Sequence, residues 1–176
     1  MNQHMKYLII DDMREHIRHP VRILRDAKHE VKTARSLDEG WQWIQDEHRR
    51  PFDLVILDLA LDKKTEEFTK EQNIIWNAMR LRHLDLLPSS GQAMGLRLWR
   101  KRREMRQRYC YMTNNRFLWR PQLDKEDPEF EKKASEGELS KEISDLILEK
   151  SSIRLDNVAE KFEIAHKIWD DKKWLE

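Results

Sequence analysis

The sequence of 176 residues contains little cysteine, glycine or proline, and it has no long hydrophobic run. The single cysteine, Cys110, excludes an internal disulfide and is compatible with a reducing cytoplasm. Four glycines and five prolines are too few for long flexible linkers, so long helices are expected. No apolar run has the length of a signal peptide or of a transmembrane helix. We therefore expect a cytoplasmic protein with one domain over residues 1–176.

Charged residues make up 38% of the chain, but 34 basic and 33 acidic residues nearly cancel. Net charge therefore predicts neither a nucleic-acid partner nor a membrane. A basic run from Arg97 to Arg108 is the feature that would favour nucleic acid. Because apolar residues interrupt this run at helical spacing, and residues 124–142 are acidic, we interpret it as a solvated helix face.

Short apolar segments alternate with segments of helical periodicity. Predicted strands are 6–10, 30–35, 52–59, 108–113 and 145–150. Predicted helices are 14–30, 36–50, 91–105 and one from about 152, where Leu155, Val158, Phe162, Ala165 and Trp169 form a stripe. Pro20 predicts that the first helix begins or bends there, and Ser36 with Glu39 predicts a capping box. The alternation predicts a doubly wound parallel sheet covered by helices on both faces.

Polar side chains follow these predicted strands at the points where the strands end. Asp11 and Asp12 end the first strand, Asp58 the third, Thr113 the fourth and Lys150 the fifth. In a parallel sheet these ends meet at one edge, where ligands bind. Three close carboxylates repel one another unless a cation joins them, and hard oxygen ligands suit Mg²⁺. A carboxylate there can also act as a nucleophile toward phosphorus.

At these residues the chain resembles the CheY-like receiver domains of two-component response regulators. The matching segments are LIIDD, HEVKTARSLDEGWQWI, FDLVILDLAL, AMGLRLW, YCYMT and LILEK. The resemblance is good over residues 1–60 and looser beyond them. It implies a flavodoxin-like fold with five strands, whose activity is to accept a phosphoryl group from a histidine kinase or a phosphotransfer protein.

The resemblance also implies roles for individual residues. Asp58 corresponds to the phosphoacceptor, and Thr113 and Lys150 correspond to the switch hydroxyl and the phosphate-binding lysine. Asp11, Asp12 and Asp58, with the backbone carbonyl of Ala60, correspond to the Mg²⁺ ligands. Any enzymatic activity would be at most phosphoryl transfer to Asp58 itself and autodephosphorylation.

The chain departs from the family in several places. It has an insertion at about 63–89 and an enlarged segment at about 115–142, and Ser151 and Ile147 replace a usual proline and aromatic residue. The insertion has Ile74, Ala78 and Leu81 at helical spacing, which predicts a helix with that face on the domain and Trp76 left for another surface. Trp119, in the enlarged segment, is also interpreted as a mark of a partner surface.

Three functions remain open on this sequence. The first is a stand-alone receiver that signals through contacts with a downstream protein, with a homodimer left open. The second is a degenerate receiver that binds a partner without phosphorylation, which the changes at Ser151 and Ile147 favour. The third is an Mg²⁺-dependent relative that processes phosphate esters, although no residue is placed as its general base. A further alternative is that the polar residues at the strand ends only form turns or lie on the surface, in which case they would have no catalytic role.

Overall fold

The computed structural model describes residues 3–61, 64–84, 91–131 and 139–176. In these residues five parallel strands form one sheet in the order β2-β1-β3-β4-β5. The strands are β1 (Lys6–Ile10), β2 (Glu30–Ala34), β3 (Leu54–Asp58), β4 (Tyr109–Thr113) and β5 (Ile147–Glu149). This is the flavodoxin-like order of a doubly wound sheet, which confirms the predicted fold class.

The central strands are buried along their whole length. Every residue of β1, β3 and β4 is buried, as expected for strands covered on both faces. β3 lies in the middle, paired with β1 on one side and β4 on the other. The apolar run that ends on Asp58 is therefore the centre of the core, and its last residue stands at the sheet's carboxyl edge.

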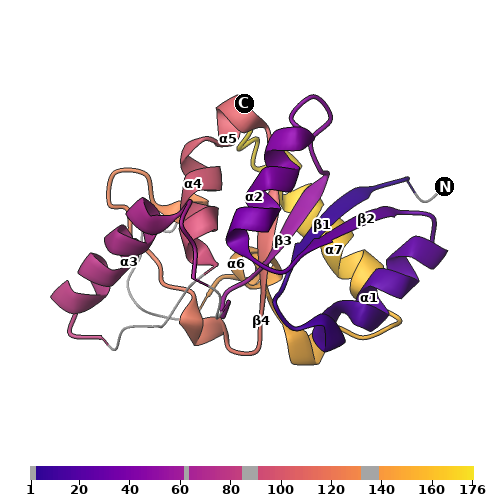
Figure 1. Ribbon diagram of the computed structural model, residues 1–176, viewed down its shortest axis with the longest axis horizontal. Coiled ribbons are helices and arrows are strands. Elements are labelled where there is room, and N and C mark those ends of the chain that lie inside the picture. The colour runs from indigo at the N-terminus through magenta and orange to yellow at the C-terminus, as the bar shows by residue number, and fades with distance from the viewer. Residues whose placement is uncertain (1–2, 62–63, 85–90, 132–138) are drawn as a thin grey trace.

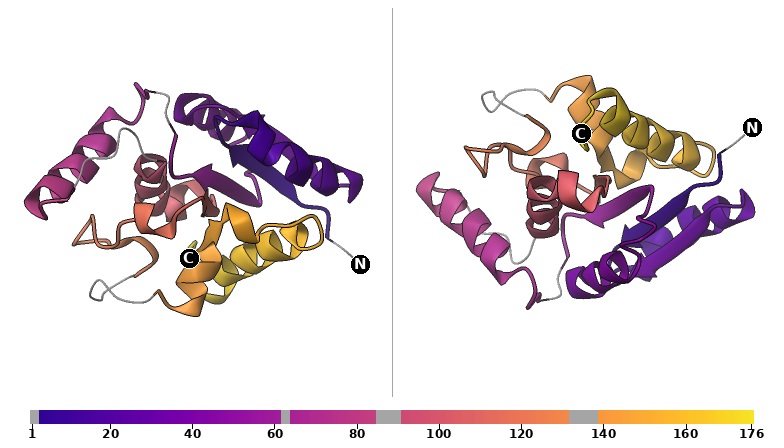
Figure 2. Two further views of the ribbon diagram at one scale, coloured as in Figure 1. Left: turned by 90° about the horizontal axis from the view of Figure 1, so that it is seen from below. Right: turned by 90° about the horizontal axis from the view of Figure 1, so that it is seen from above.

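Helices cover both faces of the sheet (Figures 1 and 2). On one face lie α1 (Arg14–Asp26) and α7 (Val158–Asp171), and the Tyr7 ring of β1 lies 5.6 Å from the Phe162 ring of α7. On the other face lie α2 (Leu37–Asp46) and α4 (Gln92–Arg100), with Gly40 of α2 packed on the side chain of Ile10. Successive residues of β1 thus serve opposite faces. No helix of the described ranges is long and apolar enough to cross a membrane.

The predicted start is correct for the second helix, α2, and only partly correct for the first helix, α1. α1 begins at Arg14 and Pro20 lies inside it, so of the two alternatives predicted for Pro20, a start or a bend of the helix, the start is wrong. The Ser36 cap is confirmed, because Ser36 Oγ accepts a hydrogen bond from the Glu39 backbone N–H at 3.1 Å. The Glu39 carboxylate accepts from the Arg35 N–H at 2.8 Å, one residue before the usual capping-box partner.

The segment between β3 and α4 contains α3 (Thr69–Leu81), which extends away from the sheet beside α4 (Figure 1). Its buried face includes Ile75 and Met79, whereas Leu81 is 83% exposed. The predicted stripe of Ile74, Ala78 and Leu81 is therefore wrong at Leu81, whereas Ala78 is partly buried against the core. On the buried face of α3, Glu71 accepts two hydrogen bonds from Arg97 of α4, of 2.8 and 3.0 Å. Trp76 is partly buried against the core, while residues 63 and 85–89 of the predicted insertion lie outside the described residues.

The basic run is paired as the sequence suggested, but only in part with the acidic stretch that follows it. It ends in α5 (Arg102–Met105) and the start of β4. Arg100 pairs with Asp124 and Arg102 with Asp127, whereas Arg108 pairs with Asp170 of α7. These side chains therefore hold the enlarged segment and α7 in place.

In its described residues, the segment between β4 and β5 contains three short helices: η1 (Arg116–Leu118), η2 (Glu129–Glu131) and α6 (Lys141–Leu146). Because α6 includes Asp145, β5 begins two residues later than predicted. After η3 (Lys150–Ser152), α7 begins at Val158, so the helix predicted from Ser152 is shorter and Leu155 is 55% exposed. The rest of its predicted stripe is buried.

Glu129 of η2 is a buried carboxylate inside this enlarged segment. Its Oε2 accepts hydrogen bonds from the hydroxyls of Tyr109 and Tyr111, the latter at 2.6 Å. Its Oε1 accepts from Trp119 Nε1 at 2.7 Å and from Gln92 Nε2 at 3.1 Å. Burial raises the pKa of Glu129, and the four donors oppose that rise. Trp119 is 3% exposed, so its interpretation as a partner surface is wrong.

Candidate functional site

The three predicted carboxylates meet at the carboxyl edge of the sheet. Asp11 directly follows β1, Asp12 comes next, and Asp58 is the last residue of β3. One carboxylate oxygen from each lies within 4.8 Å of those of the other two. Asp11 and Asp58 are buried, and Asp12 is partly buried. The two chain segments lie together because β1 and β3 are adjacent parallel strands.

In both Asp11 and Asp58, one carboxylate oxygen accepts a hydrogen bond from the backbone and the other faces the site. Oδ1 of Asp11 accepts a hydrogen bond from the Met13 N–H at 2.8 Å, and Oδ1 of Asp58 accepts from the Ala60 N–H at 3.1 Å. Both are turns in which an aspartate binds the backbone two residues later. The two Oδ2 atoms are thereby fixed in place, and both face the ammonium of Lys150.

The Lys150 ammonium bridges the two carboxylates. Its Nζ lies 2.8 Å from Asp11 Oδ2 and 3.0 Å from Asp58 Oδ2. A third contact, of 3.2 Å, joins Nζ to Nδ1 of His16 on α1. Since an ammonium has three donors, these partners can use all of them. His16 was missed from the sequence, because no spacing links it to a residue that follows β5.

Burial and charge act against each other at this site. Burial raises the pKa of Asp58; Lys150 lowers it and the nearby Asp11 raises it, and the net result is above the usual range. Burial also lowers the pKa of Lys150, but its hydrogen bonds to Asp11 and Asp58 outweigh that effect and leave this pKa raised. The lysine is therefore held as a cation between two carboxylates.

The triad has the properties of a site for a divalent metal. Three carboxylates lie close together and the Lys150 ammonium pairs with two of them, so the ionised cluster has an excess of negative charge. Asp11 Oδ2 is fully buried, and apart from its ionic contact with Lys150 it accepts no hydrogen bond from the described residues. An oxygen donor set of this kind fits Mg²⁺, which binds a few carboxylates and retains water.

Gly91, just before α4, packs directly on the backbone of Asp58. A Cβ on Gly91 would lie 1.9 Å from the Asp58 carbonyl oxygen, and the Gly91 N–H donates to the Leu59 carbonyl at 2.9 Å. Only a residue without a side chain fits this close approach. The glycine thus sets the position of the carboxylate, a role that the sequence pattern did not reveal.

Thr113 ends β4 at the same edge, and no described hydrogen bond joins its side chain to the triad. Thr113 is buried, and its hydroxyl both donates to the carbonyl and accepts from the N–H of Asn115, each at 3.1 Å. Met112 is the β4 residue in register with Asp58. Ile147, at the usual aromatic position, is fully buried. The switch role of Thr113 and the metal role of the Ala60 carbonyl stay predictions.

No family model matches this sequence, and no curated protein matches it. A solved structure described as the yeast Spc42 trimeric coiled coil fused to another structure has 12% identity and a TM-score of 0.52, covering 98% of this chain and 84% of the other. A CheY-like receiver domain protein from Methanospirillum hungatei JF-1 has 16% identity and a TM-score of 0.48, covering 97% and 98%. The N-terminal domain of a response regulator/sensory box/GGDEF protein from Carboxydothermus hydrogenoformans has 12% identity and a TM-score of 0.47, covering 96% and 98%. At these identities a likeness concerns the fold alone.

Proposed function

We propose that this protein is a receiver that accepts a phosphoryl group on Asp58 from a histidine kinase or a phosphotransfer protein, and that it signals through protein contacts. The observation that supports this most strongly is the ammonium of Lys150, 3.0 Å from Asp58 Oδ2 and 2.8 Å from Asp11 Oδ2. It offers a positive charge beside the acceptor oxygen, where a transferred phosphoryl group would need one.

The proposed reaction is a displacement at phosphorus. A carboxylate oxygen of Asp58 forms the new O–P bond while the P–N bond of the donor phosphohistidine breaks, and the leaving imidazole keeps the electron pair and takes a proton from solvent. Lys150 shifts toward an oxygen of the transferred group. Water later cleaves the acyl phosphate and restores the carboxylate.

Asp11, Asp12 and Asp58, with the Ala60 carbonyl, are the groups that would hold Mg²⁺. When bound, this ion would neutralise charge on the phosphoryl oxygens. The residues of the chain do the rest: the Met13 and Ala60 N–H groups orient the two carboxylates, and Lys150 binds the phosphoryl group.

The test is phosphorylation by acetyl phosphate with Mg²⁺, followed by intact-protein mass spectrometry. We expect the mass of one added phosphoryl group, its loss in Asp58→Asn, and its retention in Asp46→Asn, a matched change at an exposed aspartate of α2. Unmodified wild-type protein at every donor and Mg²⁺ concentration would contradict the proposal, and so would an adduct that survives Asp58→Asn.

A second candidate is a receiver-like module that binds its partner without phosphorylation. The hydroxyl of Thr113 favours it, since both of its hydrogen bonds are made to Asn115 in its own loop. A partner that binds wild-type protein and Asp58→Asn equally well, with and without acetyl phosphate, would favour this second candidate.

A further inference from the structure

One flank of α1 is a row of arginines. Arg14, Arg18, Arg22 and Arg25 follow the spacing of one helix face, beside the buried stripe that contains Ile17 and Val21. All four arginines are exposed. Like charges at a spacing of four residues destabilise a helix slightly, so this row weakens α1 unless anions balance it.

These arginines have no acidic partners in the part of the chain that the structure describes. By contrast, Arg97, Arg100 and Arg108 each pair with a carboxylate. Among the residues that line the groove beside this row, Glu15 and Asp26, at its two ends, are the acidic ones. The flank therefore carries an excess of positive charge that remains available to a ligand.

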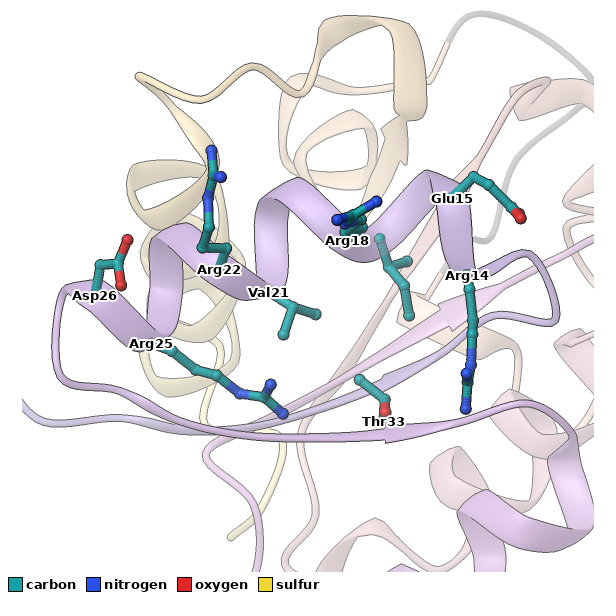
Figure 3. Close-up of a pocket in the computed structure, with 9 residues that line it drawn as sticks. Arg14, Glu15, Arg18, Val21, Arg22, Arg25, Asp26 and Thr33 are labelled. Carbon is teal, nitrogen blue, oxygen red and sulfur yellow. The ribbon is translucent and has the colours of Figure 1, made fainter.

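The row borders a groove of about 550 Å³ between α1 and β2, which we call the α1–β2 groove. Figure 3 shows Arg14 and Arg25 extending from α1 toward β2 at opposite ends, with Val21 and Thr33 between them. Arg22 points away from β2 (Figure 3), and Arg18 and Arg22 both border the groove. The groove is thus apolar in its middle and cationic at its ends.

The wall opposite α1 is the free edge of the sheet. β2 is an outer strand that pairs only with β1, and Glu30 N and Ala34 O bond toward that side. In a parallel ladder the alternate residues, Val31 and Thr33, then face outward. Arg25 Nη2 donates to the Val31 carbonyl at 2.9 Å, whereas no described hydrogen bond uses the backbone of Thr33. The backbone of Thr33 is therefore left to pair with another chain.

The dimensions suit a short extended peptide. From Arg14 to Arg25 the helix rises about 16 Å, at 1.5 Å per residue. About five residues of extended chain span that length. Carboxylates near the two ends of such a peptide would meet guanidiniums, which bind carboxylates in bidentate fashion. An apolar side chain between them would lie against Val21.

The acidic residues of the groove favour a peptide over a nucleic acid as its ligand. Glu15 and Asp26 would repel a continuous row of phosphates, and the apolar middle would gain nothing from one. We infer that the α1–β2 groove binds an acidic, extended segment of a partner protein, through the arginine row and the free edge at Thr33. This binding does not rest on phosphorylation of Asp58, because the arginines are on the β2 flank of α1 and Lys150 contacts His16 on its other flank.

The probe is a fluorescein-labelled peptide, Gly-Glu-Val-Thr-Val-Glu-Gly, and its control has glutamine for both glutamates. Fluorescence anisotropy against the full chain should show binding of the acidic peptide that weakens with salt, and no binding of the control. Arg14→Gln and Arg25→Gln should each weaken it roughly tenfold, because each removes the guanidinium at one end of the groove. Arg103→Gln, at an exposed arginine of α5, is the matched control and should bind like wild type.

Two further readouts make the result decisive. Amide hydrogen exchange at Thr33 should slow when the acidic peptide is bound, and acetyl phosphate labelling of the arginine variants should stay at the wild-type level. The inference is overturned by absence of peptide binding, by equal losses in Arg14→Gln and Arg103→Gln, or by unchanged exchange at Thr33. A DNA duplex that binds more tightly than the peptide would assign the groove to nucleic acid and also overturn it.

Discussion

Lys150 and Asp58 are 92 positions apart in the sequence, yet the lysine Nζ lies 3.0 Å from Oδ2 of the aspartate. Replacing Lys150 with Met should leave two buried carboxylates without their cation. Breaking a buried pair in this way should lower the free energy of unfolding by roughly 2–4 kcal/mol at neutral pH. Urea denaturation measures this loss, and the same variant should accept phosphoryl groups slowly. Wild-type stability for Lys150→Met would show that the ammonium contributes nothing to the cluster.

His16 should act as a positioning residue for Lys150, since its Nδ1 lies 3.2 Å from the ammonium. We expect His16→Ala to slow labelling by acetyl phosphate a few-fold, because the lysine loses one of three acceptors. His16→Asn, which restores an acceptor oxygen, should recover most of the rate. His19→Ala, at another exposed histidine of α1, is the control. Equal rates for His16→Ala and His19→Ala would remove this role.

Gly91 and Gly95 provide a matched pair of alanine substitutions. Gly91→Ala should displace the backbone of Asp58, since the new Cβ would lie 1.9 Å from its carbonyl oxygen. Gly95→Ala should disturb the Tyr111 hydroxyl, which would lie 1.6 Å from its Cβ. Both should lower the thermal midpoint. The loss of labelling per degree of lost stability should be larger for Gly91→Ala, and similar losses would show that Gly91 does not position the acceptor.

Glu129→Gln should destabilise the protein by about 1–3 kcal/mol, because an amide cannot accept from all four surrounding donors. The pKa of Glu129 is raised in the folded state, so folding takes up a proton between the folded and the unfolded pKa. Wild type should therefore gain stability relative to Glu129→Gln as the pH falls through that window. Urea denaturation at a series of pH values tests this, and a pH-independent difference would contradict it.

Mg²⁺ should stabilise the folded protein by binding the acidic triad. At a free concentration ten times the Kd, the gain would be about 1.4 kcal/mol. Differential scanning fluorimetry in Mg²⁺ against EDTA measures it, with Asp12→Asn expected to lose the shift and Asp46→Asn to keep it. An equal shift in both variants would place the ion elsewhere.

Much of the fold followed from the sequence, because burial on both faces leaves a distinct run of apolar residues in β1, β3 and β4. The polar strand ends were equally readable, and the structure brings Asp11, Asp12, Asp58 and Lys150 together at one edge. Errors arose where tertiary contacts decide local structure. Arg97 binds Glu71 on the buried face of α3, and the Trp119 indole donates to the buried carboxylate of Glu129. Phe68, Ile75 and Met79 also follow helical spacing, so periodicity allowed two faces for α3, and the inward position of Trp119 has no periodic signal.

Residues whose role depends on a close contact with a distant part of the chain could not be identified from the sequence either. Gly91 is one of four glycines, and its role depends on a carbonyl oxygen that is distant in the sequence. The contact between His16 and Lys150 depends in the same way on where the chain leaves β5. Such contacts are set only once the strands are ordered side by side, so spacing along the chain cannot reveal them.

The Glu129 cluster has a consequence for how this chain and its relatives diverge. Gly95, Tyr109, Tyr111 and Trp119 each fit the same carboxylate, so a change at one removes the reason for the others. A relative that has lost the acid has no use for two hydroxyls and an indole around it, and its α4 can carry a side chain at position 95. Substitutions at these positions should therefore be inherited together, and their joint presence would mark a lineage that shares this connection between β4 and β5 even where Asp58 has been lost.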